Sequence, residues 1–431
     1  MADNNNNRFW PRCIALVDMN AFFASIEQAE DPALWGKPVA ITNGLVGTCI
    51  ITSTYEARAY GVHTGMRIKQ ARQLCPGLIQ RPARPERYAE ISTHIMDALQ
   101  GITPDVEVFS VDEAFLDLTR CQDLWQTKEL LGLRIKEKVY RASGLKCSVG
   151  ISGDKTTAKF AAKLKKPDGL TIIPPWETAL RLRDVPATEL CGINKGIGAF
   201  LARHGAVTCG EVARLPISVL GRRFGNPGRR IWHMCQGTDP DKVETNIRAP
   251  KSVGHGKVVP PDSRDRETLY MYLIHMAEKV ATRLRQNALD AQLYSVGLRT
   301  LDSWVGDKFR TPCPTNDSKP IVKMCKLVMR DYWQGEGIFQ VHVGALDPRP
   351  ERGQYDLFGI DDSKAYKLNK AMDLINRKFG EFTLAPANLL DKSTMPNVIA
   401  PAWKPYGHRQ TIPNSGRRRD RAIVKKIYEI D

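Results

Sequence analysis

The feature that most constrains the fold is the stretch CIALVDMNAFFASIE, residues 13–27. Its first part is an apolar run that stops abruptly at Asp18. A short continuous apolar run is typical of a strand that is buried on both faces. We therefore expect a buried strand over residues 13–18 that ends on a carboxylate, which is a common place for chemistry.

A helix is predicted directly after this strand, over residues 21–30. Asn20 is a residue type that caps helices, because its side-chain oxygen can accept a hydrogen bond from a free backbone amide. Apolar side chains then recur at helical spacing, at Phe22, Ile26 and Ala29. These three are expected to face the core, whereas Phe23 lies off their stripe and requires a different role.

The length and composition of the chain indicate a multidomain protein of ordinary soluble character. At 431 residues it is too long for a single core. No stretch approaches the roughly 20 apolar residues needed to cross a bilayer, and the polar start MADNNNNR does not resemble a secretion signal. We therefore expect a cytoplasmic protein with no membrane partner.

The charge and the cysteines narrow the class further. A net charge of +16 and a pI near 9.4 favour a polyanionic partner, with nucleic acid first and an anionic membrane surface second. The 10 cysteines contain no C-x-x-C pair. This argues against a zinc ribbon and, in a cytosolic chain, against a disulfide framework.

The first half of the chain alternates strands with helices. A strand pair followed by a helix is predicted between residues 37 and 75, and a β-hairpin is predicted around Asp112 and Glu113. Neighbouring strand residues point to opposite faces, so these two carboxylates can share a ligand only if the turn or a bulge lies there. The rest of this α+β sheet domain is predicted to be a helix with Leu131, Ile135 and Val139, a strand over 145–152 and a lysine-rich helix over 156–165.

The pattern changes from about residue 184. Gly192, Gly196 and Gly198 open a predicted helix in a glycine-punctuated helical region. An extended linker then leads into a strand and a further α+β unit, for which we expect a long helix over 269–284, a strand over 291–300, a helix near 321–333 and a strand over 339–346. After Pro348 periodicity is lost, and the basic end, residues 416–431, is expected to be loosely ordered.

Three carboxylates stand at predicted strand ends or turns, namely Asp18, Asp112 and Glu113. Hard divalent cations prefer oxygen ligands, and two such ions about 3.5–4 Å apart can support in-line phosphoryl transfer. The alternative is that these residues are caps or turn formers, as strand-terminal Asp residues often are.

Neighbouring residues favour a phosphate-binding site. The amides of residues 20–23 open a helix directly after Asp18, and helix N-termini bind phosphates. Tyr55 and Arg58 lie three residues apart, on one face if helical, where they could clamp a triphosphate. The lysine-rich helix adds Lys159, Lys163 and Lys166, although such lysines can equally form a solvated helix face.

Five motifs occur in an order and spacing that resembles the Y-family translesion DNA polymerases of the bacterial DinB/UmuC type. They are DMNAFFASIE, STYEARAYGVHTGM, FSVDEAFLDLT, SVGIS with KTTAKFAAKLKKPDGL, and GINKGIG. KSVGHGK is similar to the start of that family's little finger, and the resemblance covers residues 12–348. Some motifs look DinB-like and the long C-terminal extension is more reminiscent of UmuC, so the subfamily stays open at this point.

The resemblance implies an α+β multidomain fold shaped as a right hand. Its expected parts are a disordered N-terminus (1–11), a palm (12–35 and 86–184), small fingers (36–85), a helical thumb with a helix–hairpin–helix (185–245), a linker (246–254), an α+β little finger (255–348) and a C-terminal extension (349–431). It also implies template-directed, low-fidelity DNA synthesis past damaged bases with two Mg²⁺ ions, on primer–template DNA and with dNTP as the substrate.

By the same resemblance, Asp18, Asp112 and Glu113 are the catalytic metal ligands, assisted by the backbone carbonyl of Met19. The implied nucleotide contacts are Phe22, Phe23, Thr52, Tyr55, Arg58 and Lys166. Phe23 matches the family's steric gate, an aromatic ring that excludes the ribose 2′-hydroxyl. That assignment gives Phe23 the separate role that its position off the core stripe requires.

Further partners are implied for the second half of the chain. The expected DNA contacts are Gly192, Gly196 and Gly198 in the thumb and Lys251 and Lys257 in the little finger, with Arg264, Arg266 and Arg299 adding sequence-independent affinity. The peptide QYDLF fits a bacterial sliding-clamp motif through Gln354, Leu357 and Phe358. SOS accessory proteins are possible partners, and the protein is expected to be nucleoid-associated.

Two rival functions stay open on the sequence alone. One is a catalytically idle DNA-binding or scaffold protein that has kept the fold, and the other is a two-metal nuclease. Intact Asp18, Asp112, Glu113, Tyr55, Arg58 and Lys166 argue against the first rival. The pairing of a triphosphate clamp with an aromatic gate argues against the second, since it suits a free nucleotide better than a strand to be cut.

Overall fold

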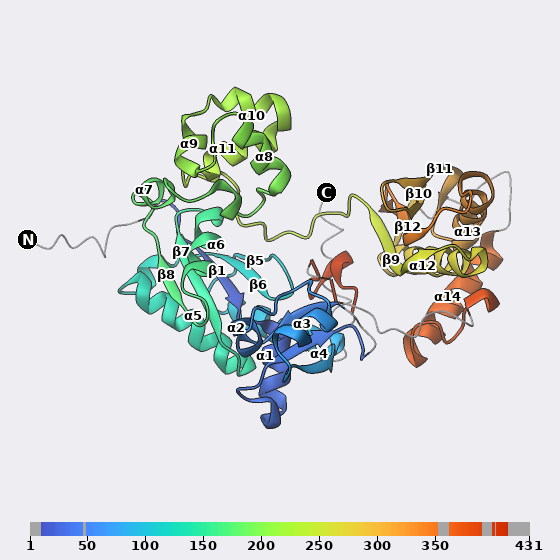
Figure 1. Cartoon of the computed structure of the whole chain (residues 1–431), viewed down its shortest axis with the longest axis horizontal. Coiled ribbons are helices and arrows are strands. Elements are labelled where there is room, and N and C mark those ends of the chain that lie inside the picture. Colours follow the sequence, from blue (N-terminus) through green and yellow to red (C-terminus); the bar gives the residue numbers. More distant parts are fainter. Residues whose placement is uncertain (1–9, 46–48, 352–361, 390–398, 401, 413–431) are drawn as a thin grey trace, which may run out of the picture. The chain divides into compact units, whose positions relative to one another are not determined.

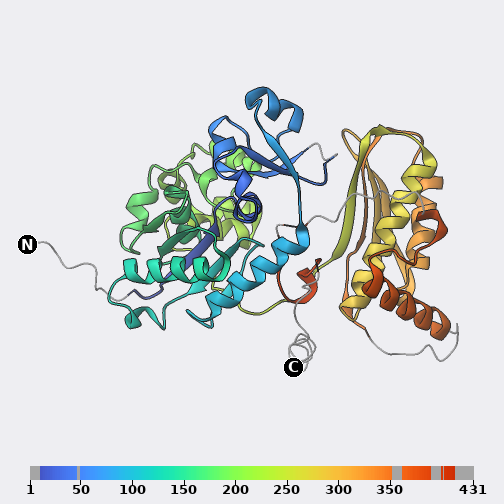
Figure 2. The same ribbon diagram turned by 90° about the horizontal axis from the view of Figure 1, so that it is seen from below.

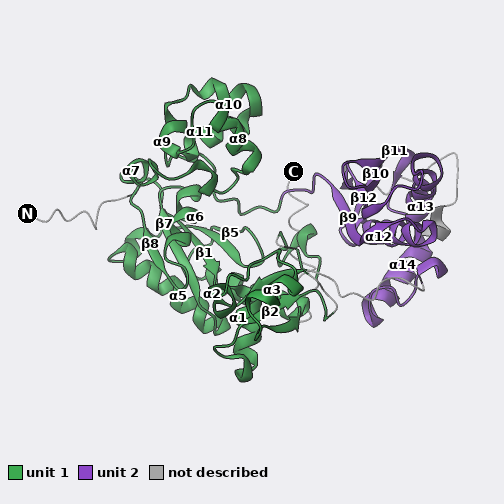
Figure 3. Ribbon diagram, in the orientation of Figure 1, with its two compact units in different colours: residues 1–247, 395–431 green, residues 248–394 purple. Residues whose placement is uncertain are grey.

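The structure is a computed structural model, and it describes residues 10–45, 49–351, 362–389, 399–400 and 402–412 (Figure 1). The chain divides into two compact units (Figure 3). Unit 1 comprises residues 1–247 and 395–431, and unit 2 comprises residues 248–394. None of the described helices combines the length and the apolar character needed to cross a bilayer.

The centre of unit 1 is a five-stranded sheet of strand order β5-β6-β1-β7-β8, here called the palm sheet. Its strands are β1 (Ile14–Met19), β5 (Val106–Val108), β6 (Glu113–Asp117), β7 (Cys147–Ser152) and β8 (Leu170–Ile172). Helices α4 (Pro85–Gln100) and α5 (Lys128–Ser143) pack on one face, and α6 (Lys155–Leu164) packs on the other. The predicted strands, the hairpin and these helices are confirmed.

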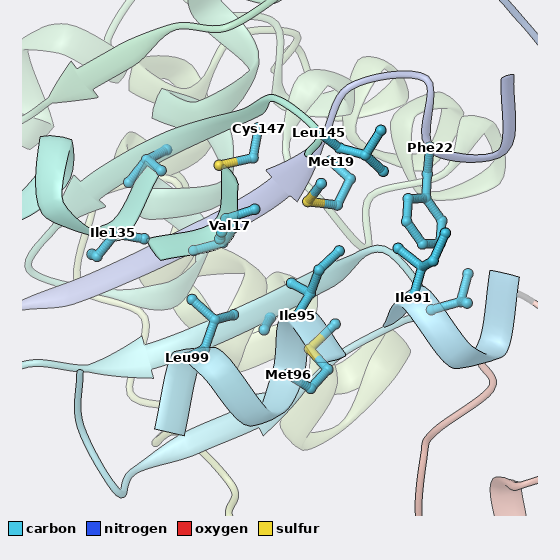
Figure 4. Close-up of a cluster of buried hydrophobic side chains, with 14 of the residues drawn as sticks. Val17, Met19, Phe22, Ile91, Ile95, Met96, Leu99, Ile135, Leu145 and Cys147 are labelled. Carbon is cyan, nitrogen blue, oxygen red and sulfur yellow. The ribbon is translucent and has the colours of Figure 1, made fainter. Parts of the chain in front are cut away.

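The alternation of β1 decides which face carries chemistry. Ala15, Val17 and Met19 belong to the core against α4 and α5, where Ile135 and Leu99 also lie (Figure 4). Ile14 and Leu16 pack instead against α6. Because strand residues alternate between faces, Asp18 lies on the α6 face of the palm sheet.

Helix α6 lies unusually close to this face. A Cβ on Gly150 of β7 would stand 2.2 Å from the carbonyl oxygen of Ala158 and 2.3 Å from the amide nitrogen of Ala162, so only glycine fits there. This close approach fixes the height of α6 above the sheet. Lys159 of α6 is thereby held against Glu113 at the start of β6.

Helix α1 (Phe22–Glu30) differs in two ways from its predicted form. Ala21, at φ 45°, occupies the N-cap position, and Asn20 does not cap the helix because its side chain is buried and bonded elsewhere. Ala29 is exposed, while Phe22, Phe23, Ile26 and Glu27 are buried. The buried face is rotated towards Phe23 and Glu27 because both contact Tyr88 of α4.

Two smaller parts complete unit 1. A three-stranded sheet of order β3-β2-β4 carries two short helices, with β2 (Val39–Thr42), β3 (Ile50–Ser53), β4 (Ile79–Pro82), α2 (Tyr55–Ala59) and α3 (Ile68–Leu74). The helices α8 (Lys195–Arg203), α9 (Cys209–Arg214), α10 (Ile217–Phe224) and α11 (Asn226–Met234) form a separate cluster with its own core. These parts correspond in order to the expected fingers and thumb.

Unit 2 is a two-layer α+β sandwich. Strands β11 (Trp304–Thr315), β10 (Leu289–Arg299), β12 (Ile338–Ala345) and β9 (Val253–Ser263) form one sheet in this order. Helices α12 (Arg266–Gln286), α13 (Ser318–Leu327) and α14 (Asp362–Phe379) lie on one side of it, as Figure 2 shows edge-on. A π-helical turn, Val328–Tyr332, extends α13.

Two elements of unit 2 were not predicted. Strand β11 is an edge strand with mostly exposed side chains, so it lacks the apolar alternation that marks a half-buried strand. Helix α14 lies in the region where no periodicity was expected after Pro348. It is held largely by polar contacts, of which the ion pair between Arg285 and Asp373 is the closest, at 2.7 Å.

The two ends of unit 1 also differ from expectation. Trp10, assigned to a disordered N-terminus, is 3 % exposed, and its backbone bonds with the Gln122 side chain. Near the other end, Trp403 is fully buried in the core of the palm sheet. Indole side chains this deeply buried belong to the fold, so both segments are structural parts of unit 1. Residues 416–431, expected to be loosely ordered, lie outside the described part of the chain.

Candidate active site

The palm sheet brings the three predicted carboxylates together at one end. Asp18 and Glu113 are directly opposite each other in the antiparallel pair of β1 and β6. Residues opposite each other in such a pair project from the same face, with Cβ atoms about 4.5–5.5 Å apart. Asp112 lies in the turn just before β6, and its carbonyl oxygen accepts a hydrogen bond of 3.0 Å from the Met19 amide.

Ser110 links the two carboxylates of the turn. Its hydroxyl donates to Asp112 Oδ1 at 2.7 Å and lies 3.3 Å from Glu113 Oε2. In a regular strand these consecutive residues would project to opposite faces. The turn instead brings the carboxylates of Asp112 and Glu113 close to the same hydroxyl. Sequence reasoning missed Ser110, although a serine two residues before an Asp in a predicted turn is a usable signal.

Two lysines from the α6 region face the carboxylates. Lys166 Nζ lies 2.5 Å from Asp18 Oδ1, and Lys159 Nζ lies 2.6 Å from Glu113 Oε1. All four side chains are largely buried, with exposed fractions between 14 % and 28 %. The predicted lysines therefore divide: Lys159 and Lys166 belong to the site, whereas Lys163 is exposed and pairs with Glu189 outside it.

The pKa values of the aspartates are displaced upwards. The pKa of Asp18 is raised to about 7, mainly by burial and also by the neighbouring Glu113 and Asp112, although Lys166 opposes the rise. Burial, more than the adjacent Glu113, also raises the pKa of Asp112, against the hydrogen bond from Ser110. Keeping these buried carboxylates ionised and close together therefore costs free energy, and an added cation would lower that cost.

The donor set suits a hard divalent cation, but its side chains are not arranged around one. Among the residues that the structure describes, no three His, Cys, Asp or Glu side chains converge at metal-binding distances. Asp18 and Glu113 are instead turned to their lysines. Carboxylate oxygens with raised pKa values at the end of a buried sheet are the chemistry that Mg²⁺ prefers, so the residues fit such an ion.

The predicted fingers residues gather beside Asp18. Arg58 donates from Nε to the Ser53 carbonyl at 3.1 Å, and its Cζ lies 4.8 Å from the centre of the Tyr55 ring. Thr52 Oγ1 is 3.5 Å from the Arg58 guanidinium. Burial raises the pKa of Tyr55, and Asp18 contributes to that rise, which places the phenol within electrostatic range of the carboxylates. The Tyr55 hydroxyl is buried and makes no hydrogen bond of normal geometry with any described residue, although Arg58 is close enough to oppose the rise in its pKa.

The two phenylalanines after Asp18 are both part of the core. Phe23 stacks on Tyr88 with ring centres 4.3 Å apart and an angle of 9°, and its ring also lies 5.5 Å from that of Phe22. The Tyr88 hydroxyl donates to Glu27 Oε1 at 2.8 Å. Phe23 therefore has a packing role in addition to any role towards a ligand, and Tyr88 fixes the orientation of its ring.

Asn20 connects the turn after Asp18 with the loop that follows Lys166. Ser148 Oγ donates to Asn20 Oδ1 at 2.9 Å and accepts from the Gly169 amide at 3.2 Å. Ser148 is fully buried and Asn20 is 5 % exposed. No local signal in the sequence could have shown this relay, because its members are up to 149 positions apart.

The three glycines predicted to contact DNA differ in their exposure and in their role in packing. Gly192 adopts a φ of 92°, and Asn194 caps α8 by accepting from the Ile197 amide at 3.0 Å. Gly198 is required for packing, because a Cβ there would meet the Thr188 methyl group at 2.5 Å, whereas Gly196 is exposed. The exposed residues around the start of α8, Gly192 and 194–196, are thus the part that could bind a phosphate.

In unit 2, Lys257 lies on the helix-covered face of the sheet. It is opposite the buried Val341, and its Nζ lies 5.6 Å from the Tyr272 ring of α12. Lys257 is thus half-buried beside α12, and its role as a DNA contact stays a prediction. Arg264 and Arg266 donate to the carbonyls of Gly335 and Met329 within unit 2, Lys251 is exposed, and the clamp residues Gln354, Leu357 and Phe358 lie outside the described residues.

Comparisons with known proteins agree with this geometry. Residues 17–163 match the model of the impB/mucB/samB family, and residues 250–357 match the model of its C-terminal domain. A DNA polymerase IV of Moorella thermoacetica is 34 % identical over 377 residues, which cover 85 % of this chain and 94 % of the relative. One of Serratia proteamaculans is 32 % identical over 79 % of this chain and 98 % of the relative.

A solved structure shows the same fold. It is a Y-family DNA polymerase chimera with a TM-score of 0.68 and 24 % sequence identity, and the match covers 78 % of this chain and 99 % of the chimera. The curated relatives also settle the subfamily that the motifs left open. The chain belongs to the DNA polymerase IV family, the DinB type of the Y-family DNA polymerases.

Proposed function

We propose that this protein adds deoxynucleotides to a primer 3′ end at the cluster of Asp18, Asp112 and Glu113, and that it copies damaged template bases with low fidelity. As a member of its family it is a DNA-directed DNA polymerase, a nucleotidyltransferase that uses divalent metal, and it binds primer–template DNA and dNTP. The observation that supports this assignment of the site is the cross-strand pairing of Asp18 with Glu113 beside the Asp112 turn.

The carboxylates would hold two Mg²⁺ ions together with the Met19 carbonyl. When bound, these ions activate the primer hydroxyl and stabilise the leaving oxygen. Lys166 and Lys159 neutralise Asp18 and Glu113 in the structure described here. Because a lysine chain is flexible and its ammonium group is a compact charge, both can turn from the carboxylates to a triphosphate when the substrate arrives.

Arg58, Tyr55 and Thr52 would bind the triphosphate with Lys166. The buried Tyr55 hydroxyl makes no hydrogen bond of normal geometry with any described residue, and a phosphate oxygen is an acceptor that it could bond. Arg58 presents its guanidinium beside that phenol, in a geometry suited to charged hydrogen bonds with phosphate. Phe23, backed by Tyr88, would serve as the steric gate against a ribose 2′-hydroxyl, with Phe22 supporting the same site.

The open face of the unit 2 sheet is the DNA-binding surface that the structure favours. Arg299, Lys308 and Arg310 lie there, because their cross-strand positions alternate with the helix-facing residues of β10 and β11. Gly254, Gly256 and Gly297 of the same face leave room for the Trp304 and His342 rings, which pack edge to face, and Arg299 lies over the Trp304 ring. Such a flat basic surface suits a phosphate backbone, and the exposed residues around the start of α8 could add a further phosphate contact.

Further partners are proposed from the sequence. Gln354, Leu357 and Phe358 would bind the bacterial sliding clamp, which would raise processivity through effective concentration. SOS accessory proteins and association with the nucleoid belong to the same proposal.

Primer extension tests the active site directly. The full chain, supplied with primer–template, dNTP and Mg²⁺, should extend the primer, and EDTA should abolish extension. Asp112→Asn should reduce the rate by about 10³-fold or more, because a ligand of the reacting centre is lost. Asp117→Asn is the matched control: Asp117 ends β6, at the other end of the strand from Asp112, and its side chain accepts a hydrogen bond from the Thr119 amide, so the variant should extend primers at a rate near wild type.

The other outcomes identify the rivals. Strand cleavage by the wild-type protein, lost in Asp112→Asn, would identify a nuclease. DNA binding without turnover in the wild-type protein would identify an idle scaffold. Extension that survives Asp112→Asn at the wild-type rate would show that the reaction takes place elsewhere in the chain.

A further inference from the structure

The described residues 399–400 and 402–412, here called the C-terminal clasp, return to the core of unit 1. Ile399, Trp403 and Ile412 are between 0 % and 3 % exposed and belong to the same apolar cluster as Ile95 and Leu99 of α4. The Trp403 indole donates to the carbonyl of Ile412 at 3.2 Å, which closes the segment on itself. A tryptophan buried to this degree needs a prepared apolar site, so the clasp occupies a specific surface.

Polar contacts fix where that surface lies. The Tyr406 hydroxyl donates to Asp97 Oδ1 on α4 at 2.5 Å. Lys404 faces Glu107 of β5, Lys155 of α6 and Glu244, and burial is the main reason why its pKa is lowered. The clasp therefore lies where α4, β5 and the chain near residue 244 meet.

This location coincides with the exit of the chain towards unit 2. A Cβ on Gly407 would stand only 2.8 Å from Ile247 Cγ2, and residue 247 is the last one of unit 1 before unit 2 begins. The Glu244 amide donates to Glu107 Oε2 at 2.7 Å, and Lys155 pairs with the same carboxylate at 2.6 Å. The point of exit is thus anchored on β5, and the clasp covers it.

We propose that the C-terminal clasp is a second tether for unit 2. The segment 248–394 is attached to unit 1 at residue 247, and its other end is held where the clasp binds beside Ile247. A body attached at one end explores a large volume, and a second attachment reduces this volume and so the entropy lost on binding a ligand that spans both units. The clasp therefore raises the affinity for primer–template DNA, an inference that rests on the proposed function.

The decisive experiment separates the tether from the packing. A protease recognition site placed within residues 390–398 of the full chain would allow this connection to be cut while the clasp stays seated in its apolar site. Spectroscopic labels at Arg141 on α5 and Lys326 on α13, both exposed, report the distribution of distances between the units. Cleavage should broaden this distribution in the DNA-free protein and weaken primer–template binding by about threefold to tenfold.

Two truncations and a point variant complete the test. Removal of residues 395–431 should have the same effect as cleavage, whereas removal of residues 413–431 keeps the clasp and serves as the matched control. Trp403→Ala should broaden the distribution by releasing the clasp, and circular dichroism with thermal unfolding shows whether unit 1 is still folded. If that variant does not fold, the cleaved protein still decides the question.

The outcomes for this proposal and for the proposed function are distinguishable. An unchanged distance distribution after cleavage would overturn the tether, whatever the polymerase activity. Absence of primer extension by the wild-type protein would count against the proposed function while leaving the distance measurement intact. A broader distribution with unchanged DNA affinity would overturn the claim that the clasp assists binding.

Discussion

The palm sheet and the sheet of unit 2 each hold a titratable side chain whose pKa is displaced by burial, in opposite directions. The palm sheet is covered by helices on both faces and holds three carboxylates at one end, where the pKa of Asp18 is raised to about 7, mainly by burial. The sheet of unit 2 is covered on one side, and there burial lowers the pKa of His255 to about 3, helped by Arg283 and Lys279.

In each unit the displacement has the same two causes, burial and neighbouring groups of like charge. Like charges held close together reduce the stability of the folded state, so they persist only where surrounding contacts over-determine them. The carboxylates of the palm sheet suit an added cation, whereas the cations around His255 lie on the helix-covered face of the unit 2 sheet. The comparison therefore predicts that neutralising a charge in the palm sheet removes activity without removing stability.

Asp18→Asn should give the largest effect. Primer extension should fall by about 10³-fold or more, because the variant loses a carboxylate at the reacting centre. The melting temperature of the metal-free protein at pH 8 should be unchanged or higher. Folding raises the pKa of Asp18 from 3.8 to about 7, so its stabilising contribution, present below pH 3.8, is lost as the pH rises through 7. A clearly lower melting temperature would show that the pair with Lys166 outweighs this cost.

Ile135→Ala on the other face of the palm sheet should give the reverse result. Ile135 is fully buried against β1 in the core of α4 and α5, and its truncation should lower the free energy of unfolding by about 2–5 kcal/mol. Below the melting temperature the rate of extension should stay within a few-fold of wild type. Urea unfolding measures the free energy of unfolding, and primer extension on the same samples measures the rate. Loss of activity in the folded variant would show that the core face of the palm sheet also contributes directly to activity.

Local pattern predicted the parts of the site that are contiguous in sequence. The apolar run before Asp18 and the alternation around Asp112 predicted β1 and the β5–β6 hairpin, and both are present. The alternation also set the condition that a turn must lie at Asp112, and the structure meets it. These predictions succeeded because the period of a strand and the chemistry of a turn are properties of neighbouring residues.

The errors concern side chains whose partners are distant in sequence. Asn20 bonds Ser148 instead of capping α1, and Phe23 is drawn into the core by Tyr88. The contact of Lys257 with the Tyr272 ring of α12 could not be predicted from the sequence either. Trp403 was missed because nothing near it in sequence shows that α4 offers it an apolar site. Each of these contacts depends on the tertiary fold, which propensity and periodicity do not encode.

Tyr88→Leu tests whether Tyr88 orients Phe23 as the steric gate, and a smaller effect on activity is expected. Without the Tyr88 ring stacked against it, the Phe23 ring is no longer held in one orientation. Ribonucleotide incorporation should therefore rise by roughly 10-fold, within the range expected for one altered packing contact. Phe23→Ala should raise it further, up to roughly 200-fold. Tyr88→Phe is the control, since it keeps the stacked ring and loses only the hydrogen bond to Glu27. Sugar discrimination that is the same in all three variants would refute the gate.

The smallest effect is expected in unit 2, where His255 should make the stability fall at acidic pH. The ring of His255 contacts Arg283 at 3.2 Å, and Lys279, His275 and His342 are near enough to oppose its protonation electrostatically. The unfolded chain takes up a proton at this residue below about pH 6.5, whereas the folded state resists protonation until about pH 3. The contribution of His255 to stability is therefore complete above pH 6.5 and is lost progressively as the pH falls towards 3.

Between pH 7.5 and pH 5 this residue should cost unit 2 about 1–2 kcal/mol of stability. Hydrogen exchange at the amides of β9 in the full chain measures that loss, and His255→Gln should make the exchange less dependent on pH. His63→Gln, in an exposed loop of unit 1, is the control. Because the palm sheet loses stability as the pH rises and unit 2 as it falls, the two units should respond to pH with opposite signs. Equal pH dependence in wild type and His255→Gln would show that the cationic neighbours of His255 do not oppose its protonation.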